Sequence, residues 1–158
     1  MRAVGAPMSE LLPLIAETVE NGGEFTFYPR GRSMLPYLSE GRDAVILSRA
    51  DELRRGDVVL YKRKNGAAVL HRIVACGDGC LTLCGDNQFS LETGVPRESI
   101  VARMTGIMRG GRQRSVSSLP SRLYIILLPA RRIYLRGVSK VRSRAAGAKK
   151  FFKDKKRG

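Results

Sequence analysis

Short apolar segments separated by Gly, Asp and Asn most constrain how this chain can fold. Apolar residues alternate with polar ones in some segments and run continuously in others, which is typical of β-strands rather than helices. The segments are residues 25–28, 44–47, 58–61, 67–74, 81–83 and 100–104. Asn65-Gly66, between two of them, is typical of a type I′ hairpin. Strands this short, with turns about every 8–12 residues, predict a mainly β domain of barrel or sandwich type.

A short helix is expected before the strands. Within residues 8–21, the apolar side chains recur at helical spacing, and Gly22-Gly23 ends the segment. After the strands, residues 109–118 resemble a flexible connector, and residues 119–136 could form a helix broken or started near Pro129.

Three regions follow from these boundaries. They are an N-terminal helical segment (1–24), a β domain (25–108) and a linker with a basic, partly helical tail (109–158).

The net charge of +15 is concentrated in the last third of the chain. Residues 1–102 hold 12 Lys and Arg against 13 Asp and Glu, whereas residues 103–158 hold 17 against one. A basic chain can indicate a nucleic-acid partner, but here the basic charge belongs to an extension of a nearly neutral domain.

No apolar segment is long enough for a secretory leader or for the ~18–20 residues of a membrane-spanning helix. The longest apolar run, residues 123–128, stops at Pro129. We therefore expect a cytoplasmic protein, with peripheral membrane contact as a possibility.

Three cysteines, Cys76, Cys80 and Cys84, recur every four residues. Gly77-Asp78-Gly79 interrupts the spacing and predicts a hairpin turn rather than a helix face. Half-buried free thiols are the first interpretation, a Cys76–Cys80 disulfide is the second, and no metal site is expected because further ligands are not nearby.

Ser33 and His71 are the candidate catalytic pair. A serine hydroxyl needs an adjacent base to become a nucleophile, and imidazole is the side chain best suited to that role. Ser33 lies in the turn Gly31-Arg32-Ser33-Met34-Leu35-Pro36, and His71 is the only histidine. A third group must orient the ring, and Asp86 is the leading candidate, although it could instead be the Asx residue of a turn.

Five short boxes carry a family resemblance. They are Gly31-x-Ser33-Met34-x-Pro36, Gly41-x-Asp43-x-Val45, Arg55-Gly56-Asp57-Val58-Val59, His71-Arg72-Ile73 and Gly85-Asp86-Asn87. In this order they resemble type I signal peptidases, and the histidine resembles the endoplasmic-reticulum and archaeal branch, where most bacterial enzymes have a lysine. The Gly-x-Ser-Met pattern also resembles the related self-cleaving repressor proteases.

The resemblance implies an all-β catalytic core in which an extended peptide or protein substrate joins a strand edge and is cut after a small residue. It implies that Ser33 is the acylating nucleophile, His71 the general base and Asp86 the residue that orients it. Met34 would shape the wall of the substrate site, with Gly31 beside it, and the mechanism would use no cofactor or metal. Arg72 points away from His71 on an ideal strand, so an ion-pair role is expected for it.

Two other classes of function stay open. Many signal peptidases carry a hydroxyl residue two positions before the nucleophile, where this chain has Gly31. That departure is compatible with a non-catalytic binding module on the same fold, recruited to a membrane or nucleic acid by its tail. A self-processing regulator is the third possibility, because residues 145–148 (Ala-Ala-Gly-Ala) offer a small-residue cleavage site.

The tail itself allows three interpretations: a solvated segment, a peripheral contact with an anionic membrane, and, least favoured, a nucleic-acid contact through residues 149–157. Apolar and basic side chains are interleaved over residues 122–136, as in interfacial helices. No motif that reads nucleic-acid bases is present.

Overall fold

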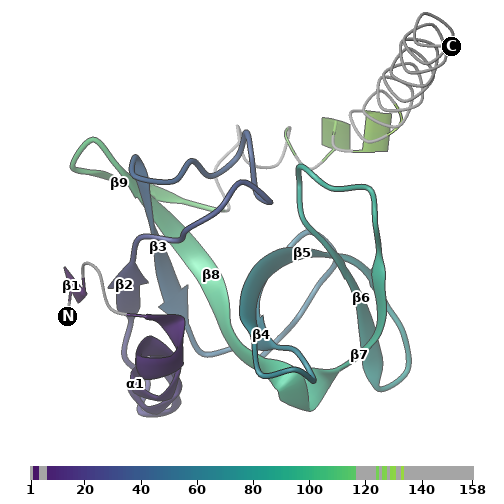
Figure 1. The fold of residues 1–158 in the computed structure, drawn as a ribbon, viewed down its shortest axis with the longest axis horizontal. Helices are drawn as coiled ribbons and strands as arrows, with labels where there is room; N and C mark the ends of the chain where they lie inside the picture. The colour runs from purple at the N-terminus through teal and green to yellow at the C-terminus, as the bar shows by residue number, and fades with distance from the viewer. Residues whose placement is uncertain are drawn as a thin grey trace, which may run out of the picture.

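The structure is a computed structural model that describes residues 2, 3 and 7–116, and residues 124, 126, 127, 129, 130 and 133 beyond them. Its elements are β1 (Arg2–Ala3), α1 (Met8–Glu20), β2 (Phe25–Phe27), β3 (Asp43–Ser48), β4 (Val58–Lys62), β5 (Ala68–Cys76), β6 (Cys80–Cys84), β7 (Glu92–Pro96), η1 (Arg97–Ser99), β8 (Ile100–Arg109) and β9 (Arg112–Ser115). The fold is mainly β with one N-terminal helix, as the sequence predicts (Figure 1).

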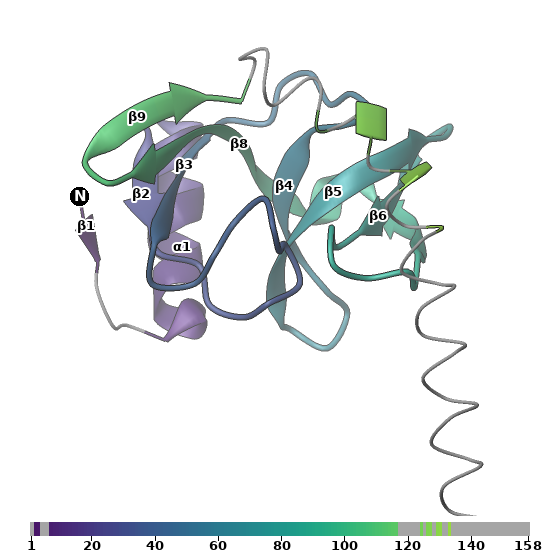
Figure 2. The same ribbon diagram turned by 90° about the horizontal axis from the view of Figure 1, so that it is seen from above.

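The strands form one sheet in the order β1-β2-β3-β8-β4-β5-β6-β7, and β9 also pairs with β8. Every pair is antiparallel except the two-residue β1, which runs parallel to β2. The sheet curls strongly at β4 to β7, and α1 packs beside β2 and β3 at the other end (Figures 1 and 2).

Two apolar clusters lie on the two faces of the central strands. The larger cluster joins α1 to β2, β3 and β8 and includes Val58 and Leu60 of β4. The smaller cluster lies among β4, β5 and β6 and includes Val59 and Tyr61. Successive strand side chains point to opposite faces, so β4 contributes alternate residues to both clusters. Strands buried on both faces explain the continuous apolar runs in the sequence.

The segment expected to be a connector differs from that expectation. Residues 112–115 form β9, a polar strand that pairs with the end of β8 through the turn at Gly110-Gly111. Both glycines have positive φ, 56° and 75°, which suits the tight turn. Regular structure therefore continues past residue 108.

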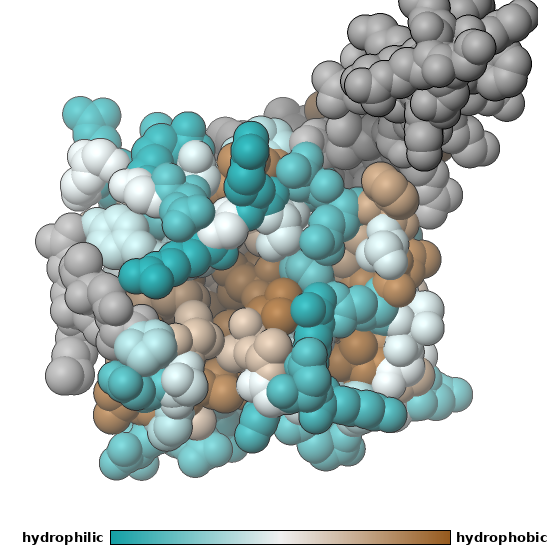
Figure 3. Space-filling view, viewed as in Figure 1, coloured by the Kyte–Doolittle hydropathy of each residue, from teal (hydrophilic) through white to brown (hydrophobic). Residues whose placement is uncertain are grey.

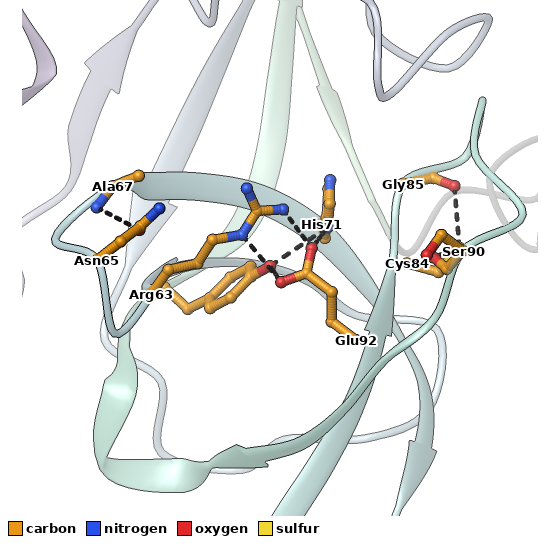
Figure 4. Close-up of polar contacts among 9 residues, drawn as sticks. Arg63, Asn65, Ala67, His71, Cys84, Gly85, Ser90 and Glu92 are labelled. Atoms are coloured by element: carbon orange, nitrogen blue, oxygen red, sulfur yellow. Dashed lines mark hydrogen bonds and ion pairs between the residues drawn. The ribbon is translucent and has the colours of Figure 1, made fainter.

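The three cysteines are free thiols in the structure. Cys84 is buried, and its Sγ lies 3.3–3.4 Å from the carbonyl oxygens of Gly85, Gln88 and Ser90. Figure 4 shows Cys84 with Gly85 and Ser90. Among the described residues, no group of three His, Cys, Asp or Glu side chains is placed to hold a metal ion. No helix in the described part of the chain is long and apolar enough to cross a membrane.

Candidate active site

Ser33 lies in the long turn between β2 and β3. A hydrogen bond holds the start of the turn: Gly31 N–H donates to a carboxylate oxygen of Glu40 at 3.0 Å. A second hydrogen bond holds the turn at Ser33, because the backbone amide of Asn87 donates to the Ser33 carbonyl at 2.7 Å. Gly31 has a φ of 96°, a conformation that glycine adopts without strain. The backbone around Ser33 is therefore held by Glu40 within its own turn and by the remote turn at residues 85–87.

Gly85 allows the second of these contacts. A Cβ built on Gly85 would lie 2.7 Å from the Ser33 carbonyl oxygen. That distance is far below van der Waals contact, so only glycine lets the turn at residues 85–87 approach the Ser33 backbone this closely. The Gly85-Asp86-Asn87 motif thus packs against the motif that contains Ser33.

Ser33 also lines a small cavity of about 190 Å³. Both residues predicted to flank the substrate, Gly31 and Met34, are in its wall, and the Met34 side chain is buried. The remaining lining residues are mainly apolar: Met8, Phe27, Pro29, Arg30, Leu38, Glu40, Leu60, Ala68, Val69 and Leu70. The space-filling view shows a hollow near the centre of one face, where apolar side chains gather (Figure 3).

Strand β5 presents an edge to this cavity. Residues 68–70 pair with β4 on one side, while β6 pairs with β5 only from Arg72 onward. In the described part of the chain, residues 68–70 therefore have a strand partner on one side only. An unpaired strand edge offers backbone donors and acceptors to an extended peptide.

His71 is the next residue of β5, and its side chain is 1% exposed. Its Nδ1 lies 3.2 Å from a carboxylate oxygen of Glu92, at the start of β7, and 3.4 Å from the Tyr61 hydroxyl. We assign the neutral tautomer with hydrogen on Nδ1, because the carboxylate can only accept a hydrogen bond. The lone pair is then on Nε2, the nitrogen a general base needs.

Glu92 is the centre of a polar network (Figure 4). Tyr61 donates its hydroxyl hydrogen to Glu92 at 2.6 Å, and Arg63 donates to the same carboxylate through Nε at 2.9 Å and through a second guanidinium nitrogen. Burial raises the pKa of the Glu92 carboxyl, but the hydrogen bonds from Arg63 and Tyr61 outweigh it and hold the pKa below its usual range. Glu92 is therefore ionised at neutral pH.

The imidazole of His71 responds to two opposing influences. Burial lowers its pKa, since the charged form loses hydration, and the negative charge of Glu92 raises it. Burial is the larger cause, so the pKa lies below the ordinary 6.5. At pH 7 the ring is neutral and can accept a proton.

Asp86 lies on the other face of β5. Its two carboxylate oxygens accept hydrogen bonds from Arg72 at 2.9 and 2.7 Å, and both side chains are almost fully buried. The expected ion-pair role of Arg72 is confirmed. The predicted role of Asp86 as the orienting group differs from this arrangement, because the carboxylate at Nδ1 is that of Glu92.

Ser33 and His71 lie in the same region, since residues 68–70, which directly precede His71 in β5, line the Ser33 cavity. The His71 ring itself lies against Tyr61, with ring centroids 6.0 Å apart, and against Glu92. Within the described residues no hydrogen bond joins Ser33 Oγ to the imidazole. The turn at residues 85–87 links the Ser33 backbone to Arg72, since Asn87 binds Ser33 and Asp86 binds Arg72.

Neither Glu92 nor its two donors, Tyr61 and Arg63, stands out in the sequence as a site residue. Glu92 begins a strand that contains Gly94 and Pro96, a composition that does not resemble a strand. The available signal was its position seven residues after Gly85, in the segment following the last box.

Searches for similar proteins match nothing: no protein-family model, no curated protein and no solved structure corresponds to this chain. Its chemistry must therefore be inferred from its own residues.

Proposed function

We propose that this protein is a serine endopeptidase of the signal-peptidase type that cuts an extended peptide after a small residue. The observation that carries the proposal is the buried, neutral His71 held through Nδ1 by the Glu92 carboxylate. A carboxylate at this nitrogen selects the reactive tautomer and stabilises the imidazolium that forms during catalysis.

The cavity beside Ser33 supports the substrate class. Its volume of about 190 Å³ and its apolar wall suit short aliphatic side chains. The unpaired edge at residues 68–70 would bind the peptide backbone as an added strand, while the cavity would receive a side chain of that peptide. The bound peptide would then run toward Ser33.

In the proposed reaction, Ser33 Oγ attacks the scissile carbonyl and its proton passes to Nε2 of His71. The imidazolium then donates this proton to the departing amine, so that the C–N bond breaks and an ester to Ser33 remains. Water, deprotonated by the same nitrogen, hydrolyses the ester and regenerates the serine. The Ser33 backbone N–H would donate to the oxyanion, since Gly31 provides no side-chain donor.

This scheme requires Ser33 Oγ to come within hydrogen-bond reach of Nε2 when the substrate binds. Catalytic hydrogen bonds are often long or poorly aligned before substrate arrives and tighten in the complex. The hydrogen bonds from Gly31 to Glu40 and from Asn87 to Ser33 limit this movement to the Ser33 side chain and the few residues around it.

The decisive experiment compares Ser33→Ala, His71→Ala and Ser39→Ala in a peptide-cleavage assay with mass-spectrometric readout. Ser39 is a matched control, because it lies in the same turn and outside the lining of the cavity. The first two variants are expected to lose at least about 10³-fold in turnover, and the third to retain it. Unchanged turnover in either of the first two would overturn the proposal. The same spectra would show any self-cleavage at residues 145–148.

A second candidate is a peptide-binding module that does not cleave. It is favoured by the absence of a Ser33–His71 hydrogen bond among the described residues and by Gly31 at the expected donor position. A fluorophosphonate probe distinguishes the two candidates: labelling of Ser33 that requires His71 supports the peptidase. Peptide binding without any labelling supports the module.

A further inference from the structure

We propose that Arg109, the last residue of β8, is a positioning residue for Ser33, because its guanidinium joins the buried Asp43 carboxylate to the backbone of the turn that carries the serine. The inference rests on the proposed peptidase function and deepens it. Arg109 lies outside the lining of the Ser33 cavity, so it would act through the turn and not on the substrate.

The Asp43 carboxylate is the centre of this arrangement, and its side chain is fully buried. Its Oδ1 accepts hydrogen bonds from Nε of Arg42 at 3.0 Å and from Nε of Arg109 at 2.7 Å. Its Oδ2 accepts from Nη2 of both arginines at 2.9 Å and from the Ser39 backbone N–H at 2.8 Å. Burial raises the pKa of Asp43, but these hydrogen bonds outweigh it and lower the pKa to about 2. The carboxylate is therefore ionised at neutral pH and pairs with both arginines.

Strand pairing brings Arg109 to this carboxylate. Asp43 and Arg109 lie opposite each other in the antiparallel pair β3–β8, at the end of the sheet where the Ser33 turn enters β3 (Figure 1). Side chains directly opposite in such a pair are close enough to meet. The two residues are 66 positions apart in the chain, so the contact exists only in the folded sheet.

Arg109 makes one contact that Arg42 does not make. Its Nη2 also donates to the carbonyl oxygen of Tyr37, in the Ser33 turn, at 3.0 Å. A guanidinium is planar and carries five donors in a fixed fork, so one arginine can hold two acceptors in a single geometry. Among the described residues, the Arg42 side chain donates only to Asp43. Arg109 therefore ties the turn to the sheet, whereas Arg42 only neutralises the carboxylate.

The Tyr37 contact reaches Ser33 through one helical turn of backbone. Leu38 N–H donates to the Met34 carbonyl at 2.9 Å, and both side chains are buried in the larger apolar cluster. A hydrogen bond between residues four apart fixes the residues that it encloses. Tyr37 is one of these, and Ser33 directly precedes them. A displacement of Tyr37 would therefore move Ser33.

The test compares Arg109→Gln with Arg42→Gln. Each variant removes a guanidinium that makes two hydrogen bonds to Asp43, and only the first also removes the contact to Tyr37. A misplacement of about 1 Å can cost ~10²-fold in rate, so we expect kcat to fall at least about tenfold in Arg109→Gln and less than about threefold in Arg42→Gln. Steady-state peptide cleavage measures both. Equal kcat values in the two variants would overturn the proposal.

The pH profile shows which member of the catalytic pair Arg109 serves. The charges that shift the pKa of His71 are those of Glu92, Arg63 and Asp86. The acidic limb of kcat/KM should therefore stay in place in Arg109→Gln, although kcat falls. A limb that moves would show that Arg109 acts on the base, and would contradict its assignment to the Ser33 turn.

Amide hydrogen exchange tests the same contact without catalysis. The Leu38 amide closes the helical turn, and the Asn87 amide binds the Ser33 carbonyl. Both should exchange at least about tenfold faster in Arg109→Gln than in Arg42→Gln, while the Ile15 amide of α1 exchanges alike in the two variants. Equal acceleration at all three amides would indicate global destabilisation and refute positioning. If the unchanged protein cleaves no peptide, faster local exchange would still stand, and only the peptidase proposal would fail.

Arg109→Lys replaces Arg109→Gln if the latter does not fold. Lysine keeps the positive charge beside Asp43, but its single nitrogen does not reproduce the fork that reaches both carboxylate oxygens and the Tyr37 carbonyl. Its kcat should still lie below that of Arg42→Gln, with faster exchange at Leu38 and Asn87. A kcat equal to or above that of Arg42→Gln would overturn the proposal.

Discussion

His71 and Arg72 are neighbours in β5, and each meets a carboxylate, but on opposite faces of the strand. On one face, Arg72 and Asp86 are 3% and 0% exposed and share two hydrogen bonds. On the other face, His71 is 1% exposed, but its partner Glu92 is 27% exposed and also binds Arg63. Arg72 and Asp86 thus form an ion pair that is shielded from solvent. His71 and Glu92 instead pair a neutral imidazole, which can gain or lose a proton, with a partly exposed carboxylate.

In the proposed enzyme, one strand would provide both a rigid ion pair and a general base. A buried ion pair with both partners satisfied fixes geometry and is expensive to disturb. A buried imidazole near a partly exposed carboxylate stays neutral and can change its protonation state within the accessible pH range. The alternation of side chains places one arrangement directly behind the other. Substitutions on the His71 face should therefore mainly change kcat, and substitutions on the Arg72 face should mainly change the free energy of unfolding.

The largest effect is expected for Glu92→Gln, which should lower kcat about 10³-fold (roughly 4 kcal/mol) while leaving the protein folded. The amide fits the same space but cannot stabilise the imidazolium, and it no longer imposes a single tautomer on His71. Arg63→Gln is the informative companion, because it removes the competing cation and leaves the His71–Glu92 contact in place. It should reduce kcat far less. Steady-state kinetics measures both.

The pH dependence of the same variant gives a second readout. The His71 pKa lies below 6.5, so kcat/KM should fall as the pH drops below 6.5 and the base becomes protonated. The Glu92 charge raises this pKa, and its removal in Glu92→Gln should move the acidic limb to still lower pH. A limb that moves upward, or an unchanged kcat, would show that Glu92 does not act on His71.

On the opposite face, Asp86→Asn should destabilise the fold by about 3–5 kcal/mol, because it leaves the Arg72 charge buried without its counter-ion. The control is Asp51→Asn, which breaks the exposed Arg49–Asp51 pair and should cost less than about 1 kcal/mol. Urea unfolding measures both. The double variant Arg72→Met/Asp86→Leu should recover much of the loss, and the acidic limb should move less in Asp86→Asn than in Glu92→Gln.

This comparison also shows what could be predicted from the sequence. The strands at residues 44–47 and 58–61 and the helix at 8–21 were predictable, because their apolar patterns match burial on one or both faces. Strand β7 was not, since Gly94 and Pro96 obscure it, and Pro is tolerated there because β7 lies at the end of the sheet path. All four residues of strand β9 are polar and exposed, so the strand carries no apolar signal.

The residues of the candidate site likewise divide into those that could be predicted from the sequence and those that could not. Ser33, His71 and Arg72 stood out through their boxes, and the opposite direction of Arg72 followed from strand alternation. Which carboxylate meets which cation depends instead on the pairing of β5, β6 and β7, where Leu83 aligns with Glu92 and with Ile73. Bulges shift that pairing in both strand pairs, so no count of residues along the chain gives it. Asp86 was the natural prediction because its box is recognisable.

Gly85 lies against the Ser33 backbone, and Gly85→Ala tests whether this contact positions the serine. The added methyl group would meet the Ser33 carbonyl oxygen at 2.7 Å, so the turn at 85–87 and the Ser33 turn must separate. We expect roughly 1–3 kcal/mol of destabilisation and at least a tenfold loss of kcat/KM. Gly77→Ala is matched, since its nearest neighbours lie at 3.6 Å. Similar activities of the two variants would mean that this contact does not position Ser33.

The smallest effect is expected for Tyr61→Phe, which separates the contribution of the Tyr61 hydroxyl from that of Glu92. Tyr61→Phe removes the hydroxyl that donates to Glu92 at 2.6 Å and leaves the ring in the apolar cluster. One hydrogen bond to a charged acceptor is lost, so the free energy of unfolding should fall by about 1–3 kcal/mol. Arg63 and His71 still hold the carboxylate, and kcat should therefore change only a few-fold. If Tyr61→Phe instead lowers kcat as much as Glu92→Gln does, the hydroxyl 3.4 Å from Nδ1 also orients the ring, and Glu92 does not position His71 alone.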